Sequence, residues 1–298
     1  MKFLTFYHNN IEKLGLKVRE GVIDLAAAAE TIGIQADFPY NMMDFIRQGE
    51  AALEALQTFL THVKLTAEAP YLLDEATLTF APAVPNPSKI ICIGLNYKKH
   101  ADETKAPYPE VPILFNKYNN ALTGHRSKVA VPKTTKRLDH EVELGIVIGK
   151  KGKYISEAKA LDYVFGYCTT NDLSARDIQK RTSQWMTGKT NDGFAPVGPY
   201  VVTKDEIPNP NNLQLKTIVN GEVRQDSNTR DMIFNCEKLI NYISQYMTLE
   251  PGDLIMTGTP EGVILGRPKE ERVYLQPGDV VTVEVEKLGA LTIYLVAE

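Results

Sequence analysis

Two glutamates at the start of one apolar segment are the first residues in the sequence that could do chemistry together. Glu141 and Glu143 are two residues apart, and residues 143–148 are apolar after the first position and rich in β-branched side chains, as in a buried strand. Side chains alternate between the faces of a strand, so both carboxylates point the same way. Adjacent carboxylates resist burial unless a cation neutralises them, and all-oxygen ligands favour a hard divalent ion. The alternative is a solvated row on a half-exposed strand.

A third carboxylate follows another apolar segment. Residues 164–170 have the composition of a strand, and Asp172 comes directly after them, where it could meet Glu141 and Glu143. The alternative for Asp172 is an N-cap of the turn that follows. On that turn, Arg176 and Gln179 are three residues apart, a spacing suited to binding a carboxylate or a carbonyl group.

A histidine and a glutamate form a second candidate pair. His100 and Glu103 are three residues apart, so their side chains meet if this stretch is helical. A carboxylate beside an imidazole orients the ring, as general base catalysis requires. The alternative is a surface contact on a flexible loop. Residues 104–112 are rich in proline and charge and lack periodicity, so we expect a mobile lid there.

Two loops carry further groups suited to an anionic substrate. Lys189 lies in a loop that contains Gly188, but the upstream glycines of a phosphate-binding loop are missing. Gly258 and Thr259 belong to a Thr-Gly-Thr-Pro turn, residues 257–260, whose hydroxyl and backbone N–H groups could bind an anion. The alternative is a tight connection between strands.

The elements that must position these residues divide the chain into two predicted regions. Residues 1–75 are expected to form a small α+β domain, with strands at 3–7 and 17–25 and helices at 26–31 and 42–63. Three prolines within residues 81–88 forbid a helix and mark an extended entry to the second region, residues 76–298. That region is expected to be mostly β, with an Asn-Gly hairpin at residues 220–221 and one long helix at 231–246.

Composition excludes several kinds of partner. A net charge of -4 on 298 residues offers no general attraction to nucleic acid or to an anionic membrane. No apolar run approaches the roughly 20 residues that span a bilayer, and the N-terminus becomes polar too soon for a signal peptide. Three cysteines far apart suit reduced thiols. We therefore expect a cytoplasmic protein that binds neither nucleic acid nor membrane.

The motifs, taken in order, resemble the fumarylacetoacetate hydrolase family. The set runs Gly94-Leu95-Asn96-Tyr97, His100 with Glu103, Glu141-Val142-Glu143-Leu144, Gly166-Tyr167, Asn171-Asp172, Ala175-Arg176-Asp177, Gly188-Lys189, Pro196-Val197-Gly198-Pro199, Val219-Asn220-Gly221-Glu222 and Thr257-Gly258-Thr259-Pro260. Each motif alone is weak, but the ordered set, which covers roughly residues 85–296, is specific. His140 and Val142 depart from the family pattern, which more often has Tyr and a small residue there.

This resemblance implies a fold and a site. The fold would be α+β and mostly β, a mixed β-sandwich roll behind the small N-terminal domain, assembled as a homodimer. A magnesium or manganese ion, with no organic cofactor, would be held by Glu141, Glu143 and Asp172. The catalytic residues would be His100, Glu103 and Lys189. The substrate would contact Arg176, Gln179, Lys189, Gly258 and Thr259.

The implied reaction is cleavage of a carbon–carbon bond in a 2-oxo acid through a metal-stabilised pyruvate enolate. In hydrolysis of an acylpyruvate or fumarylpyruvate, His100 would activate water, whereas in decarboxylation of oxaloacetate no water attacks. One alternative is an isomerase of the 2-hydroxyhepta-2,4-diene-1,7-dioate or 5-carboxymethyl-2-hydroxymuconate type. Another is an inactive, metal-binding dimeric scaffold. The intact pair of His100 and Glu103 favours cleavage over isomerisation.

Overall fold

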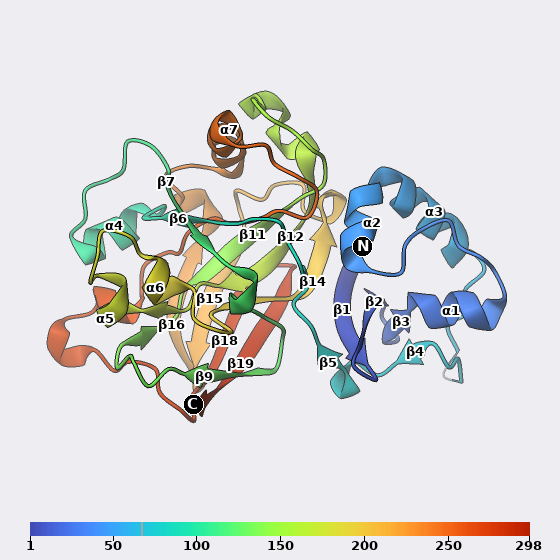
Figure 1. The fold of residues 1–298 in the computed structure, drawn as a ribbon, viewed down its shortest axis with the longest axis horizontal. Helices are drawn as coiled ribbons and strands as arrows, with labels where there is room; N and C mark the ends of the chain where they lie inside the picture. The colour runs from blue at the N-terminus through green and yellow to red at the C-terminus, as the bar shows by residue number, and fades with distance from the viewer. Residues whose placement is uncertain (67) are drawn as a thin grey trace.

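The computed structural model describes residues 1–66 and 68–298, which form two large β-sheets and one two-stranded sheet with helices around them (Figure 1). The larger sheet has twelve strands. They are β1 Lys2–His8, β2 Ile11–Lys17, β3 Val22–Asp24, β4 Leu72–Leu73, β5 Thr79–Phe80, β6 Ile90–Gly94, β7 Ile113–Lys117, β8 Leu122–Thr123, β11 Val142–Ile148, β12 Val164–Asn171, β14 Ala195–Thr203 and β17 Leu254–Met256. Along the sheet the order is β4-β3-β2-β1-β14-β12-β11-β17-β6-β7, while β5 pairs with β1 and β8 pairs with β14.

The second sheet has five strands in the order β16-β15-β18-β19-β9. Their bounds are β9 Ser127–Val131, β15 Gln214–Val219, β16 Glu222–Asn228, β18 Val280–Val285 and β19 Gly289–Ala297. A short pair joins β10 Leu138–Asp139 to β13 Ser174–Ala175. The α-helices of the described residues are α1 Leu25–Ile32, α2 Met42–Gln48, α3 Glu50–Leu60, α4 Lys98–Thr104, α5 Arg176–Gln179, α6 Met186–Lys189 and α7 Cys236–Tyr246. No helix in the described ranges is long and apolar enough to cross a membrane.

Strand β11 shows how the sheets share one core. Val142, Leu144 and Ile146 belong to the hydrophobic cluster that also contains Val283 of the second sheet. Val147, on the opposite face of β11, belongs to another cluster together with the N-terminal helices. Because side chains alternate along a strand, Glu143 lies on the same face as Val147. The predicted α+β, mostly β class of the chain is confirmed.

The N-terminal strands continue the larger sheet. Strand β1 pairs with β14 in the antiparallel register Phe3↔Val201. Phe3 also packs against Phe45 of α2, with ring centroids 4.8 Å apart, and against Phe165 of β12. Residues 1–75 therefore share both a sheet and a hydrophobic cluster with the rest of the chain. Their division from residues 76–298 as a separate domain stays a prediction.

Three predicted elements differ from the structure. Residues 17–25 are not one strand, because β2 ends at Lys17, and after a turn the chain returns as β3, which pairs with β2. The predicted helix at 42–63 is broken at Gly49, whose φ of 62° is a left-handed conformation that glycine adopts without strain. The long helix begins later than predicted, at Cys236, where the Asn235 side chain accepts a hydrogen bond from the Lys238 N–H.

Candidate active site

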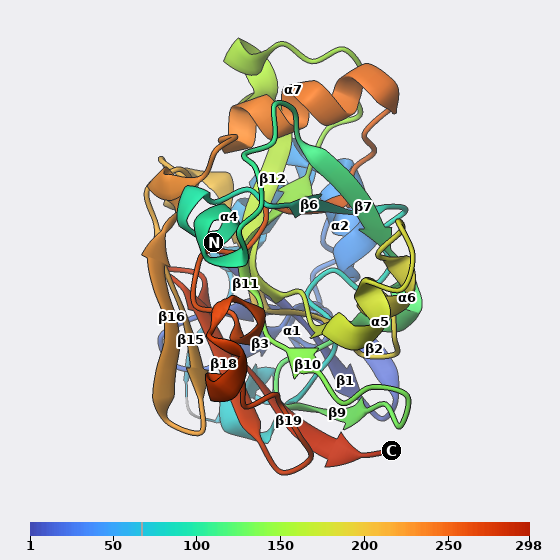
Figure 2. The ribbon, with the colours of Figure 1, turned by 90° about the vertical axis from the view of Figure 1, so that its left-hand side faces the viewer.

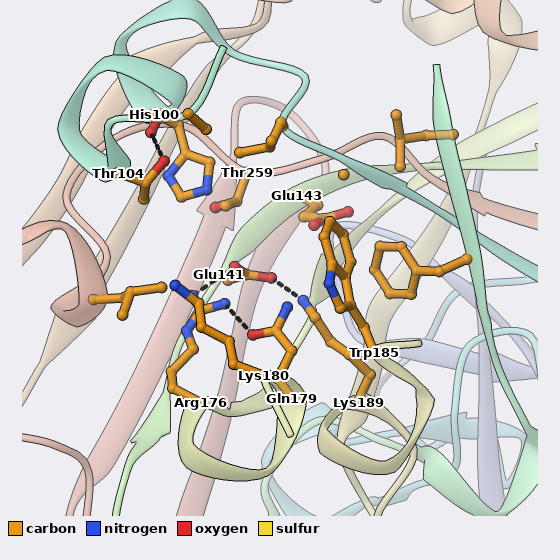
Figure 3. Close-up of a pocket in the computed structure, with 16 residues that line it drawn as sticks. His100, Thr104, Glu141, Glu143, Arg176, Gln179, Lys180, Trp185, Lys189 and Thr259 are labelled. Atoms are coloured by element: carbon orange, nitrogen blue, oxygen red, sulfur yellow. Dashed lines mark hydrogen bonds and ion pairs between the residues drawn. The ribbon is translucent and has the colours of Figure 1, made fainter. Parts of the chain in front are cut away.

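A cavity of about 220 Å³ lies where α4, α5, α6 and β11 come together (Figures 2 and 3). The predicted site residues that line it are His100, Glu141, Glu143, Arg176, Gln179, Lys189 and Thr259. The remaining three lie behind the lining, each bonded to a residue that lines it: Glu103 to His100, Asp172 to Lys189 and Gly258 to Glu143. The structure thus brings all the predicted site residues to one place.

The three predicted carboxylate ligands are neighbours. Glu141, Glu143 and Asp172 each offer an oxygen within 4.8 Å of the others, and all three side chains are buried. Strand pairing explains this proximity, because β11 and β12 pair at Val142↔Asn171 and the Asp172 N–H donates to the Glu141 carbonyl at 2.9 Å. The interpretation of Glu141 and Glu143 as a solvated row is therefore wrong.

Cations surround two of these carboxylates. Lys189 Nζ lies 2.5 Å from Glu141 Oε2 and 2.6 Å from Asp172 Oδ2, and Arg176 Nη2 lies 2.6 Å from Glu141 Oε1. Burial alone would raise the pKa of Glu141, but the attraction of Arg176 and Lys189 outweighs it and holds that pKa well below its usual range. The buried ammonium of Lys117 also lies 2.6 Å from Asp172 Oδ1. That contact lacks hydrogen-bond geometry, so Oδ1 has no hydrogen-bond donor.

Glu143 lacks such compensation. Among the described residues, no basic side chain forms an ion pair with it, and the Gly258 N–H, 2.9 Å from Oε2, is its one hydrogen-bond donor. Burial, together with the charges of Asp172 and Glu141, raises the pKa of Glu143 well above its usual value. A divalent cation would supply the missing positive charge, so this oxygen-only set fits a magnesium or manganese ion.

Gly258 can make this contact because it is glycine. Its φ of 95° is strained for other residues, and a Cβ atom there would lie 2.8 Å from the Asn96 Cβ. The resulting turn directs the Gly258 N–H at Glu143 rather than at a ligand. Thr259, the next residue, lines the cavity, and its hydroxyl accepts a 2.9 Å hydrogen bond from Gln225 Nε2.

His100 faces the cavity from the side opposite Arg176, Gln179 and Lys189 (Figure 3). Helix α4 sets its spacing from Glu103, and His100 Nδ1 lies 2.8 Å from Glu103 Oε1. The second oxygen of Glu103 accepts the Gly262 N–H at 2.9 Å, which fixes the carboxylate. With Glu103 as acceptor, Nδ1 carries the proton and Nε2 has a free lone pair. His100 is 6% exposed, so the pair is not the surface contact considered as its alternative.

Several residues of the site carry no strong local signal in the sequence. Asp139 accepts the Arg176 Nε–H at 2.8 Å and orients that guanidinium. Trp185 and Phe115 form an apolar wall of the cavity, with ring centroids 5.4 Å apart. Trp185 could have been noticed as the one tryptophan of the chain, and Lys117 as a lysine that ends an apolar strand.

The last residue of α4, Thr104, and the segment that follows it, through Ala106, border the cavity. Helix α4 ends there in a left-handed residue, Lys105, with a φ of 56°, and Tyr108 donates a 2.8 Å hydrogen bond to Asp102. Closure of residues 104–112 over a substrate stays a prediction.

Comparison with known proteins places this site in a family. The model of the fumarylacetoacetate (FAA) hydrolase C-terminal domain matches residues 89–296. Bovine oxaloacetate tautomerase FAHD2A, mitochondrial, is 42% identical over 273 residues, which are 91% of this chain and 82% of the relative. The human protein of the same name is 42% identical over 282 residues, 93% of this chain and 85% of the relative.

Solved structures agree over the whole chain. Fumarylacetoacetate hydrolase from Exiguobacterium antarcticum superposes with a TM-score of 0.82 at 32% identity and covers 100% of both chains. Maleylpyruvate hydrolase from Sphingobium sp. SYK-6, in complex with manganese (II) ion and pyruvate, has a TM-score of 0.79 at 29% identity and covers 100% of this chain and 99% of that chain.

The comparisons correct one expectation. The oxaloacetate tautomerases, 40–42% identical over most of the chain, are named as mitochondrial, so the predicted cytoplasmic location is wrong. Sparse, unpaired cysteines suit any reducing compartment and could not distinguish between them. The matched domain and the end-to-end relatives agree: this chain belongs to the fumarylacetoacetate hydrolase family.

Proposed function

We propose that this protein is a divalent-metal-dependent enzyme that interconverts the keto and enol forms of oxaloacetate. The observation that carries the proposal is the pair of His100 and Glu103, whose Nδ1–Oε1 distance is 2.8 Å, facing a buried carboxylate triad across one cavity. The names of relatives at 40–42% identity support the choice of oxaloacetate.

Glu141, Glu143 and Asp172 would hold one magnesium or manganese ion. When bound, the ion would act as a Lewis acid on the 2-oxo acid and stabilise negative charge on its oxygens. The manganese and pyruvate in the maleylpyruvate hydrolase structure support this assignment. We further propose a homodimer, as the family resemblance implies.

Lys189, Arg176 and Gln179 would bind the substrate and its developing charge. All three line the cavity, and the guanidinium of Arg176 is held by Asp139 and donates to Gln179 Oε1 at 3.1 Å. Positive groups fixed in this way stabilise an enolate without having to reorganise during the reaction. Thr259, held by Gln225, would complete the lining, and Gly258 would act from behind it by holding Glu143.

His100 would move the proton. Its free Nε2 takes a proton from the carbon between the two carbonyl groups of oxaloacetate, and the electron pair of that C–H bond forms the enolate. Returning a proton to the enolate oxygen gives the enol, so the reaction has no net change in composition. Glu103 would stabilise the imidazolium that forms in between.

Carbon–carbon cleavage is the second candidate, and the same histidine favours it. If His100 takes a proton from water instead, the hydroxide attacks the distal carbonyl of an acylpyruvate. The carbon–carbon bond then breaks, and the products are a carboxylic acid and, after protonation of its enolate, pyruvate. Similarity to maleylpyruvate hydrolase supports this reading. Oxaloacetate decarboxylation would use the same enolate, with carbon dioxide leaving and no attacking water.

A paired assay tests the proposal. In the first assay, enol oxaloacetate is added to the Mn²⁺-loaded protein, to chelator-treated protein and to Mn²⁺ alone, and its decay is followed by ultraviolet absorbance. In the second assay, acetylpyruvate is the substrate and the release of pyruvate is measured. We expect enol decay above the Mn²⁺ blank that falls by about 10²-fold or more in His100→Ala. Pyruvate release from acetylpyruvate would favour the second candidate. Decay equal to the Mn²⁺ blank would refute tautomerase activity.

A further inference from the structure

A second cavity, of about 520 Å³, adjoins the one that holds the candidate site. The two share Thr104, Lys180 and Leu265 as lining residues, so they meet at one boundary. Its walls come from the end of α4, the end of α5 and residues 265–272, which gather on one side of the molecule (Figure 1). We call this second cavity the basic vestibule, for the residues described next.

Positive charge dominates the vestibule. Its basic lining residues are Lys105, Lys180, Arg267, Lys269 and Arg272. Within the part of the chain that the structure describes, none of these five forms an ion pair with a carboxylate, although fifteen ion pairs occur elsewhere. The acidic residue of the lining, Glu103, is already bonded to His100 and to the Gly262 N–H. The vestibule therefore has an excess of cations that face solvent-filled space.

Lys180 stands where the vestibule meets the candidate site. It directly follows Gln179, and Figure 3 shows it beside Arg176 at the cavity. Partial burial, with the repulsion of Arg176 and Arg272, lowers the pKa of Lys180. Arg272 cannot easily turn away, because its Nε donates to the Arg267 carbonyl at 2.8 Å. An anion between these groups would relieve the repulsion.

We propose that Lys180, with the arginines of the vestibule, binds the second carboxylate of a 2-oxo dicarboxylic substrate and selects such substrates over monocarboxylic ones. This deepens the function proposed above and rests on it. The first carboxylate and the 2-oxo group would lie against Arg176, Gln179 and Lys189. An uncharged end would gain nothing from these cations and would pack against apolar lining residues such as Trp185, Phe115 and Leu265.

Two five-carbon ligands isolate the second carboxylate. 2-Oxoglutarate and 2-oxopentanoate share the 2-oxo acid end and differ in having a carboxylate or a methyl group at the other. Trp185, the single tryptophan, lines the candidate site, so its fluorescence reports binding of either ligand to the Mn²⁺-loaded protein. We expect 2-oxoglutarate to bind about tenfold more tightly than 2-oxopentanoate, because a hydrogen bond to a charged group at an exposed position contributes a factor at the low end of the range for such bonds.

Variants assign this preference to Lys180. Lys180→Ala is expected to bring the ratio of the two dissociation constants close to one, and Lys180→Glu to invert it. Lys128→Ala removes an exposed lysine on β9, away from both cavities, and should keep the tenfold ratio. A ratio near one in the natural sequence, or a tenfold ratio that survives in Lys180→Ala, would overturn the proposal.

Turnover separates this proposal from the function on which it rests. The ratio of kcat/KM for oxaloacetate to kcat/KM for acetylpyruvate is compared between the natural protein and Lys180→Ala. If the protein is active and this ratio does not change, the protein has the function without the subsite. Protein that turns over neither compound but keeps the binding preference has the subsite without the function. Failure of both ligands to quench Trp185 would overturn the subsite together with the 2-oxo acid site.

Discussion

Replacing Glu143 by Gln separates the metal site from the fold. Burial and the charges of two neighbouring carboxylates raise the pKa of Glu143 well above its usual value and so favour its uncharged form, which Gln resembles in shape and charge. The amide oxygen can still accept the Gly258 N–H, and the new NH₂ group faces Glu141 and Asp172. Without metal, the free energy of unfolding of Glu143→Gln should therefore lie within about 1 kcal/mol of that of the natural protein.

The stabilisation by added metal should differ more strongly between Glu143→Gln and the natural protein. A cation at 100 times its dissociation constant stabilises a folded protein by about 2.7 kcal/mol. With an unfolding entropy of about 2.1 cal/mol/K per residue over 298 residues, 1 kcal/mol corresponds to about 1.6 °C, so Mn²⁺ should raise Tm by about 4 °C. Gln cannot provide a charged ligand, and we expect a rise below 1 °C in Glu143→Gln.

Thermal unfolding with and without Mn²⁺, each against a chelated sample, measures both effects. Glu12→Gln is the matched control, because burial also raises the pKa of Glu12 but that residue lies on β2, outside the site. It should keep the full Mn²⁺ response. A rise of about 4 °C in Glu143→Gln, equal to that of the control, would show that the ion is bound elsewhere and would refute the assignment of the triad.

Three further perturbations test other parts of the structure. Lys117→Met should lower the free energy of unfolding, measured in urea, by about 3–5 kcal/mol, because buried Asp172 loses a cation and the Phe194 carbonyl loses its hydrogen-bond donor at 2.8 Å. A loss under 1 kcal/mol would contradict the pairing of Lys117 with Asp172. Burial, with the charge of Arg126, lowers the pKa of His125 from 6.5 to about 4, so the unfolded chain binds the extra proton between these values and stability falls as pH drops through that window. His125→Gln should remove about 1 kcal/mol of the fall between pH 7 and pH 5, and an unchanged pH profile of Tm would argue against it. Glu103→Ala should lower kcat for oxaloacetate at least tenfold while leaving the Mn²⁺-induced rise in Tm intact; a lost Tm response would place Glu103 in the metal site instead.

Local spacing made part of the site predictable. Strand alternation alone placed Glu141 and Glu143 on one face, and helical spacing alone paired His100 with Glu103. Neither inference needs to know which elements touch. The expected meeting of Asp172 with the two glutamates did depend on a tertiary contact, because it required the strand that ends at Asn171 to lie beside the strand of Glu143, as β12 and β11 do.

Contacts between distant segments were not predictable in this way. The ammonium of Lys117, the last residue of β7, reaches Asp172, 55 residues later, although β7 pairs with β6 and not with β12, which leads to Asp172. Strand β1 joins β14 across some 200 residues, so the N-terminal region looked separate in the sequence although it shares a sheet with the rest. A break such as that at Gly49 depends on a single φ angle, which helical periodicity does not reveal.

Charge explains why the site would need its cation before its substrate. The buried carboxylates Asp139, Glu141 and Asp172 face three buried cations, Lys117, Arg176 and Lys189, so with Glu143 protonated the metal-free group is neutral and does not attract a 2-oxo acid. A divalent ion, with Glu143 ionised to bind it, gives the group one net positive charge, and the vestibule cations, which form no ion pair among the described residues, add to it. The buried group with its bound divalent ion has the charge to balance a monoanion. The charge of a second carboxylate is therefore left for the cations of the basic vestibule to neutralise.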